Sequence, residues 1–122
     1  MKNRTALIVE DDPGSKKYIC LLLNKLNCQF IAADTGEQAI ELLQEAAVDI
    51  MLLDIALGPG MSGIDLGMKL KQNGRHAETP MIAVSAFSKE EVEQLNPAGF
   101  NDYLTKPYTI KELESILDKY LD

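Results

Sequence analysis

The amino-acid sequence predicts an α/β fold in which helices cover both faces of a parallel sheet. Short apolar runs rich in β-branched residues alternate with longer amphipathic stretches, a pattern typical of βαβ units. Most of the short runs are apolar throughout, as expected for strands that are buried on both faces. The chain has 122 residues, of which 46% are hydrophobic, so we expect one domain with enough apolar side chains to fill a core.

Five strands are predicted from the apolar runs. They cover residues 6–9, 29–32, 50–53, 81–84 and 103–105. A stretch with helical spacing separates each run from the next. The first run is stopped by Glu10, which makes it far too short for a secretory signal or a membrane span. We therefore expect a soluble, cytoplasmic protein.

The helix starts are marked by side chains that can accept hydrogen bonds from the first backbone N–H groups of a helix. Asp12 before Pro13 offers a cap and a preformed first residue. Four pairs have the spacing of a capping box: Thr35 with Gln38, Ser62 with Asp65 as a weaker version, Ser88 with Glu91, and Thr109 with Glu112. After Thr109, apolar residues recur at helical spacing, so the chain is expected to end on an amphipathic helix. No linker or second domain is evident, and we expect one domain over residues 1–122.

The charge of the chain excludes some classes of partner. The formal net charge is −7, which disfavours direct contact with nucleic acid or with an anionic membrane surface. A cationic ligand or partner suits such a surface better. Cys20 and Cys28 lack metal-ligand spacing, so we expect reduced, packed thiols.

Polar residues stand where four of the predicted strands end. They are Glu10, Asp11 and Asp12 after the first strand, Asp54 at the end of the third, Ser85 after the fourth and Lys106 after the fifth. Functional groups of an open parallel sheet collect at the carboxyl ends of its strands. Three or four carboxylates, one hydroxyl and one ammonium group are therefore expected to converge.

Crowded carboxylates repel each other unless they are protonated or a cation neutralises them. Mg²⁺ suits such a site, because it prefers oxygen ligands and binds through one or two carboxylates plus a phosphate. Lys106 could neutralise an incoming phosphoryl group, and the Ser85 hydroxyl could donate to its oxygens. Asp54, on the central strand, is the natural nucleophile and would form an aspartyl phosphate.

Each of these residues has a simpler interpretation when it is taken alone. Asp12 could serve only as a helix cap, and Glu10 and Asp11 could form a solvated loop edge. Ser85 could be an ordinary loop hydroxyl and Lys106 a surface lysine. The joint pattern favours the site. His76, the single histidine, stands in a loop after a helix and is expected to be solvated rather than a phosphodonor.

Five stretches of the chain resemble a known family. They are LIVEDDP from Leu7, LLDI from Leu52, GMSGIDL from Gly60, AVSA from Ala83 and DYLTKPY from Asp102. Together they resemble the receiver domains of two-component response regulators over nearly the whole chain. The resemblance implies a doubly wound, five-stranded sheet with strand order 2-1-3-4-5 in a flavodoxin-like three-layer sandwich.

The resemblance also implies roles for the residues of the site. Asp54 would be the phosphorylation site and a magnesium ligand. Asp11 would bind Mg²⁺ directly, and Glu10 would bind it largely through water. The backbone carbonyl of Ala56 would supply a further ligand. The phosphoryl donor would be a phosphohistidine on a histidine kinase or a phosphotransfer protein, and the domain would catalyse its own phosphorylation and dephosphorylation.

Switching is the second property that the resemblance implies. Ser85 would hold a phosphoryl oxygen, Lys106 would pair with the phosphate, and Tyr103 on the fifth strand would turn inward when Ser85 moves. A half-buried strand aromatic is the simpler interpretation of Tyr103. The surface of the fourth helix, fifth strand and fifth helix would report the change to an effector that the sequence does not identify. A monomer or a phosphorylation-dependent dimer is expected.

One loop departs from the common pattern of the family. Many receivers have a proline four residues after the phosphorylated aspartate, whereas Pro59 stands five residues after Asp54, between two glycines. The inserted residue leaves an alternative function, a receiver-like interaction domain that no longer accepts phosphate. A haloacid dehalogenase-type phosphatase would need an acid where Ala56 stands. A flavin-binding module would need a phosphate loop rich in Ser, Thr and Gly after the first strand, and that loop is acidic here.

Overall fold

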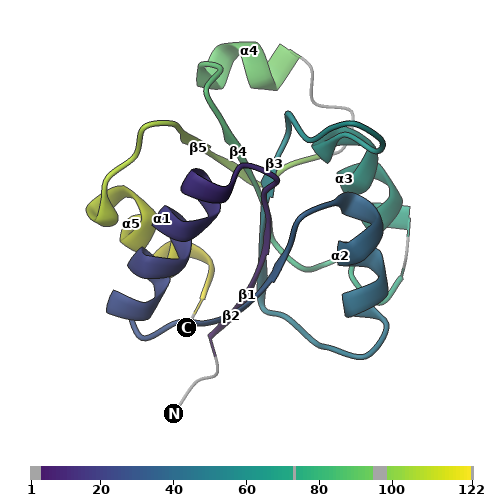
Figure 1. Ribbon diagram of the computed structural model, residues 1–122, viewed down its shortest axis with the longest axis horizontal. Helices are drawn as coiled ribbons and strands as arrows, with labels where there is room; N and C mark the ends of the chain where they lie inside the picture. Colours follow the sequence, from purple (N-terminus) through teal and green to yellow (C-terminus); the bar gives the residue numbers. More distant parts are fainter. Residues whose placement is uncertain (1–3, 73, 95–98, 122) are drawn as a thin grey trace.

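The computed structural model describes residues 4–72, 74–94 and 99–121 (Figure 1), so the remaining positions of the predicted 1–122 domain lie outside the described residues. Strands and helices alternate along the described chain. In order they are β1 (Thr5–Val9), α1 (Pro13–Lys25), β2 (Gln29–Ala33), α2 (Gly36–Leu43), β3 (Ile50–Asp54), α3 (Gly63–Gln72), β4 (Met81–Ser85), α4 (Lys89–Gln94), β5 (Asp102–Thr105) and α5 (Ile110–Tyr120).

The five strands form one parallel sheet with the order β2-β1-β3-β4-β5. Helices α1 and α5 cover one face of the sheet and α2 and α3 cover the other, which gives three layers (Figure 1). The predicted fold class and strand order are confirmed. Each observed strand is one residue longer than its apolar run. The added residues include Asp54 and Ser85, because the hydrogen-bonded ladder continues past the last apolar side chain.

The strands bury both of their faces. Alternate side chains face α2 and α3, namely Leu7, Val9, Met51, Leu53, Met81 and Ala83. Their neighbours face α1 and α5, namely Ala6, Ile8, Ile50, Leu52, Ile82 and Val84. The sheet thus divides the core into two layers, as the continuous apolar runs require. Both cysteines are free thiols, and Cys28 is buried in the second layer.

The predicted helix starts are observed. The Asp12 carboxylate accepts a hydrogen bond from the Ser15 N–H at 2.8 Å. Thr35 caps α2, although the Gln38 side chain accepts from the N–H of Asp34, one residue before the cap. Reciprocal capping boxes form at Ser62 with Asp65, Ser88 with Glu91, and Thr109 with Glu112. None of the helices in the described ranges is long and apolar enough to cross a membrane.

The prediction that His76 is solvated is wrong, because its side chain is only 4% exposed. The loop that holds it lies against the ends of α2 and α3. There the Arg75 guanidinium donates to the backbone carbonyl of Gln44 at 3.1 Å, and the Thr79 N–H donates to the carbonyl of His76 at 3.1 Å. His76 stands next to apolar residues of both helices, including Leu43. Asn73, at the start of this loop, lies outside the described residues.

Candidate functional site

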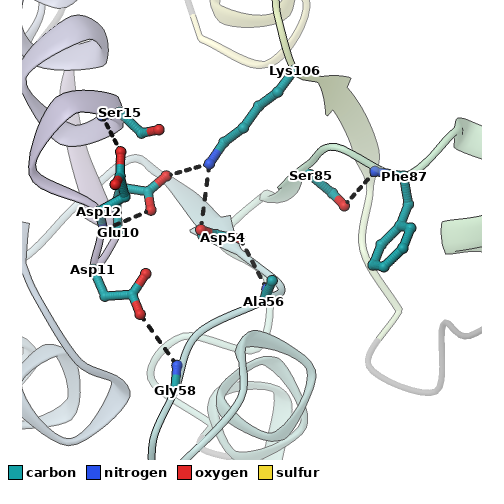
Figure 2. Close-up of polar contacts among 10 residues, drawn as sticks. All are labelled: Glu10, Asp11, Asp12, Ser15, Asp54, Ala56, Gly58, Ser85, Phe87 and Lys106. Atoms are coloured by element: carbon teal, nitrogen blue, oxygen red, sulfur yellow. Dashed lines mark hydrogen bonds and ion pairs between the residues drawn. The ribbon is translucent and has the colours of Figure 1, made fainter.

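Three carboxylates meet at the carboxyl edge of the sheet. Glu10 and Asp11 directly follow β1, and Asp54 is the last residue of the neighbouring strand β3. One carboxylate oxygen from each lies within 4.8 Å of the others. Glu10 and Asp54 are 4% and 6% exposed, whereas Asp11 is open to solvent. The predicted convergence of acidic residues is therefore observed (Figure 2).

Lys106 brings a positive charge to this cluster from the end of β5. Its Nζ lies 2.7 Å from Glu10 Oε1 and 3.4 Å from Asp54 Oδ2. Figure 2 shows the side chain reaching across the pocket to both acids. Burial by itself lowers the pKa of Lys106, but the hydrogen bond to Glu10 and the charge of Asp54 outweigh it and raise the pKa. Lys106 therefore stays protonated beside two buried carboxylates.

The charge of the cluster is not balanced by Lys106. Burial and the neighbouring Asp54 side chain raise the pKa of Glu10 to about 7, against the opposite effects of Lys106 and the N–H of Asp12. A glutamate that is paired with lysine would ordinarily be more acidic than usual, so burial, followed by the neighbouring Asp54, dominates here. A further cation at this cluster would relieve the repulsion between the carboxylates. The donors are all oxygen atoms and Asp11 is open to water, a combination that fits Mg²⁺.

The loop after Asp54 contacts two of the acids. The Ala56 N–H donates to Asp54 Oδ1 at 2.9 Å, and the Gly58 N–H donates to Asp11 Oδ2 at 3.4 Å. The backbone of Ala56 therefore lies beside the Asp54 carboxylate, and the role of its carbonyl as a metal ligand stays a prediction. Asp12 serves as the cap of α1, and its hydrogen bonds with Ser15 lower its pKa.

Ser85 lies at the end of β4 and is 3% exposed. Its Oγ accepts a hydrogen bond from the Phe87 N–H at 2.9 Å. Figure 2 shows the hydroxyl directed toward Phe87 and away from Lys106. The sheet brings Ser85 to the predicted edge, but its hydroxyl oxygen is engaged with the next turn of the chain.

Tyr103 lies on β5 opposite Ala83 of β4, two residues before Ser85. Its ring is half-buried and packs against the apolar layer that faces α2 and α3. This position agrees both with the predicted switch and with a simple strand aromatic.

The comparisons with known proteins agree with this geometry. A family model described as the response regulator receiver domain matches residues 6–118. The chain belongs to this family. This chain is 34% identical over 117 residues to the signal transduction histidine-protein kinase BarA of Escherichia coli K12. The aligned region covers 95% of this chain and 13% of BarA. It is also 35% identical over 112 residues to the phosphate regulon transcriptional regulatory protein PhoB of the same strain. Here the aligned region covers 90% of this chain and 48% of PhoB.

Solved receiver structures share the fold of this receiver domain. The receiver domain of the sensor histidine kinase PA1611 of Pseudomonas aeruginosa PAO1, solved with a magnesium ion coordinated in its active site cleft, has a TM-score of 0.86 and 28% identity, and 97% of each chain is covered. A response regulator described as putative, from Chloroflexus aurantiacus, has a TM-score of 0.91 and 28% identity, and 98% of each chain is covered.

Gly63 is a residue of the site region whose role the sequence did not reveal. A Cβ atom at Gly63 would lie 2.1 Å from the backbone oxygen of Asp54 and 2.5 Å from the Cα of Ile55. The first residue of α3 therefore packs directly on the end of β3, where the receiver domain holds Asp54. The signal in the sequence was a glycine directly after the helix-capping Ser62, within the GMSGIDL stretch.

Proposed function

We propose that this receiver domain accepts one phosphoryl group on Asp54 from a phosphohistidine of a histidine kinase or phosphotransfer protein, in a reaction that depends on Mg²⁺. The observation that supports the proposal most strongly is the state of Asp54. Its carboxylate is buried, lies within 3.4 Å of the Lys106 ammonium group, and shares its pocket with two further acids. A carboxylate held in this way is a positioned nucleophile with a cation beside it.

In the proposed reaction, a carboxylate oxygen of Asp54 forms a bond to phosphorus. The phosphorus–nitrogen bond of the phosphohistidine breaks, and its electron pair returns to the ring nitrogen. Glu10, Asp11, Asp54 and the carbonyl of Ala56 would hold the metal ion. Mg²⁺, when bound, supplies positive charge that offsets the repulsion between the carboxylates and the phosphoryl oxygens.

Lys106 and Ser85 would respond to the new group. The Lys106 ammonium already lies beside Asp54, so phosphoryl oxygens there would give it stronger acceptors than Glu10. The Ser85 hydroxyl would turn from the Phe87 N–H, a neutral contact worth about 0.5–1.5 kcal/mol. A hydrogen bond to a charged acceptor is worth about 1.5–3 kcal/mol, so the turn is favourable only after phosphorylation. Tyr103 would then move inward and change the surface of α4, β5 and α5.

The wider setting of the reaction is also proposed. BarA is named as a histidine kinase and PhoB as a transcriptional regulator, and the chain spans less than half of either. We place the receiver domain in the cytoplasm, where free thiols such as Cys20 and Cys28 persist. As part of the proposal, it acts as a monomer or as a dimer that forms on phosphorylation.

Incubation with Mg²⁺ and acetyl phosphate tests the central step. Intact mass spectrometry should show the addition of one labile phosphoryl group, which is absent when EDTA replaces Mg²⁺. The Asp54→Asn variant should gain none, because an amide is not a nucleophile for phosphorus. Equal labelling of Asp54→Asn would refute the assignment of Asp54. Absence of labelling in the unaltered chain would favour a domain that interacts without accepting phosphate.

A further inference from the structure

The geometry of the loop after Asp54 points to a positioning role for the backbone N–H of Gly58. We propose that it orients the Asp11 carboxylate for the metal ion, so that the unusual loop forms part of the magnesium site. This inference rests on the proposed function. It concerns a group that touches a metal ligand and not the reacting atoms, so Gly58 is a positioning residue.

Two alternate N–H groups of the loop point at carboxylates from two different strands. Ala56 donates to Asp54 of β3, and Gly58 donates to Asp11 beyond β1. Figure 2 shows one Asp11 oxygen directed at Gly58 and the other directed back toward Glu10 and Asp54. The loop therefore fixes the relative placement of two of the expected metal ligands.

Asp11 needs this contact more than its neighbours do. Glu10 and Asp54 are buried and share Lys106, whereas Asp11 is exposed. Within the described part of the chain, the Gly58 N–H is the hydrogen-bond donor to the Asp11 side chain. An exposed aspartate without a donor would sample several rotamers, and ordering it on metal binding would cost entropy. A donor that holds one oxygen reduces that cost in advance.

The loop is anchored on both sides of Gly58. Leu57 is buried in the apolar layer that faces α2 and α3. Met61 packs so closely on the start of α2 that its Sδ lies 2.9 Å from the Cβ position of Gly36. These anchors hold the loop backbone in place, and the N–H between them is preorganised.

Position 58 supplies an N–H group and makes no use of the absence of a side chain. A Cβ atom at Gly58 would meet nothing within 4 Å, and its φ lies outside the left-handed region. Alanine would therefore fit and keep the N–H, whereas proline would remove it. The two substitutions separate the proposed contact from a general need for flexibility.

Magnesium titration by isothermal calorimetry tests the proposal on the unaltered chain, Gly58→Ala and Gly58→Pro. We expect Gly58→Ala to bind like the unaltered chain, and Gly58→Pro to bind about three- to tenfold more weakly. This is the range for a hydrogen bond of ordinary strength, because a contact of 3.4 Å on an exposed carboxylate lacks the extra strength of a short hydrogen bond to a buried charge. Thermal unfolding without metal checks that both variants are folded. Equal affinity of a folded Gly58→Pro, or equal weakening by both substitutions, would overturn the positioning role.

A second measurement keeps the loop sequence intact. In ¹H–¹⁵N spectra recorded without metal, the Gly58 amide proton should shift upfield and exchange faster in Asp11→Ala. Glu37→Ala is the matched control, because the Glu37 carboxylate lies 3.4 Å from the Cβ position of Gly60 in the same loop. The contact would be contradicted if the chemical shift and exchange rate of the Gly58 amide proton did not change in Asp11→Ala, or changed equally in both variants.

The outcomes also separate the inference from the proposed function. If the unaltered chain binds Mg²⁺ and is phosphorylated on Asp54, but a folded Gly58→Pro binds Mg²⁺ with the same affinity, only the positioning role fails. If the unaltered chain does not bind Mg²⁺, both fail.

Discussion

The three clustered acids have different surroundings, and these decide what each can do. Asp54 has the Ala56 N–H on one oxygen and Lys106 near the other. Glu10 is buried and has a raised pKa, so it is the acid that gains most from a further cation. Asp11 is exposed and lies where a hydrated ion can enter. Under the proposed function, these surroundings suit Asp54 to be the nucleophile, Glu10 to balance the charge of the cation, and Asp11 to meet the ion as it enters.

Replacement of Lys106 by alanine should impair phosphorylation more than magnesium binding. The ammonium group faces Asp54 and would meet the phosphoryl oxygens, whereas the oxygen ligands of the metal remain. We expect Lys106→Ala to keep the magnesium affinity of the unaltered chain in calorimetry and to gain less phosphate from acetyl phosphate. Lys119→Ala, a lysine on α5 that pairs with Asp102, is the control for loss of one positive charge. Abolished magnesium affinity in Lys106→Ala would show that the division of roles is wrong.

The secondary-structure elements hold the site through close backbone packing. The start of α3 lies on the end of β3, with the Gly63 N–H donating to the Ile55 carbonyl at 3.3 Å. At the far side of the sheet, β5 is tied to α5 by side-chain hydrogen bonds. Asp102 Oδ2 accepts from Lys119 Nζ and from the Tyr120 hydroxyl, each at 3.0 Å. These contacts connect the site and the expected output surface to rigid elements.

Gly63→Ala should destabilise the receiver domain. The new methyl group would overlap the backbone of Asp54, which cannot move aside like a flexible side chain. Overpacking of this kind costs about 1–3 kcal/mol, and urea unfolding should show a loss in that range. Gly74→Ala is the matched control, because a Cβ atom there would meet nothing within 4 Å. Equal stability of both variants would contradict the close packing.

The Asp102 contacts should make stability depend on pH. Burial by itself raises the pKa of Asp102, but Lys119, the N–H of Tyr103 and the Tyr120 hydroxyl outweigh it and lower the pKa from its ordinary value of 3.8. A carboxylate with a lowered pKa stabilises the fold above pH 3.8, and this contribution is lost as the pH falls through the lowered value. Asp102→Asn should therefore be less stable than the unaltered chain at pH 7. The difference in unfolding free energy should shrink below about pH 4, and a difference that grows there would refute the pairing.

At the scale of the whole molecule, the strand order gathers residues that are far apart in the sequence. Glu10 and Asp54 come from adjacent central strands, and Lys106 joins them from the end of the edge strand β5. Helix α4 stands at the end of the sheet where β1 passes into α1 (Figure 1), which is the end where Glu10 and Asp11 lie. A change of charge in the pocket therefore acts at the carboxyl ends of several strands at once and not on a single strand.

Magnesium should stabilise the folded receiver domain as a whole. The three carboxylates converge only in the fold, so the ion binds the folded state in preference to the unfolded chain. At 100 times the Kd, such binding adds about 2.7 kcal/mol. The Tm should rise with Mg²⁺ and less so in Asp11→Asn, which loses a charged ligand but keeps an acceptor for the Gly58 N–H. An equal rise with NaCl at matched ionic strength would show general screening instead of a site.

The sequence determined the order of the elements and which residue types stand at the strand ends. Apolar runs, helix caps and the charged residues that follow the apolar runs are local features of the sequence. The sheet, the helix starts and the convergence of Glu10, Asp11, Asp54 and Lys106 could therefore be predicted. Only the tertiary structure decided how the charges pair, that His76 is buried and that Gly63 touches the backbone of Asp54. These outcomes depend on distances between segments that are remote in the chain. The loop after Asp54 shows the difference most clearly, because its glycines indicated a permissive turn, whereas the fold places the N–H of Gly58 on Asp11.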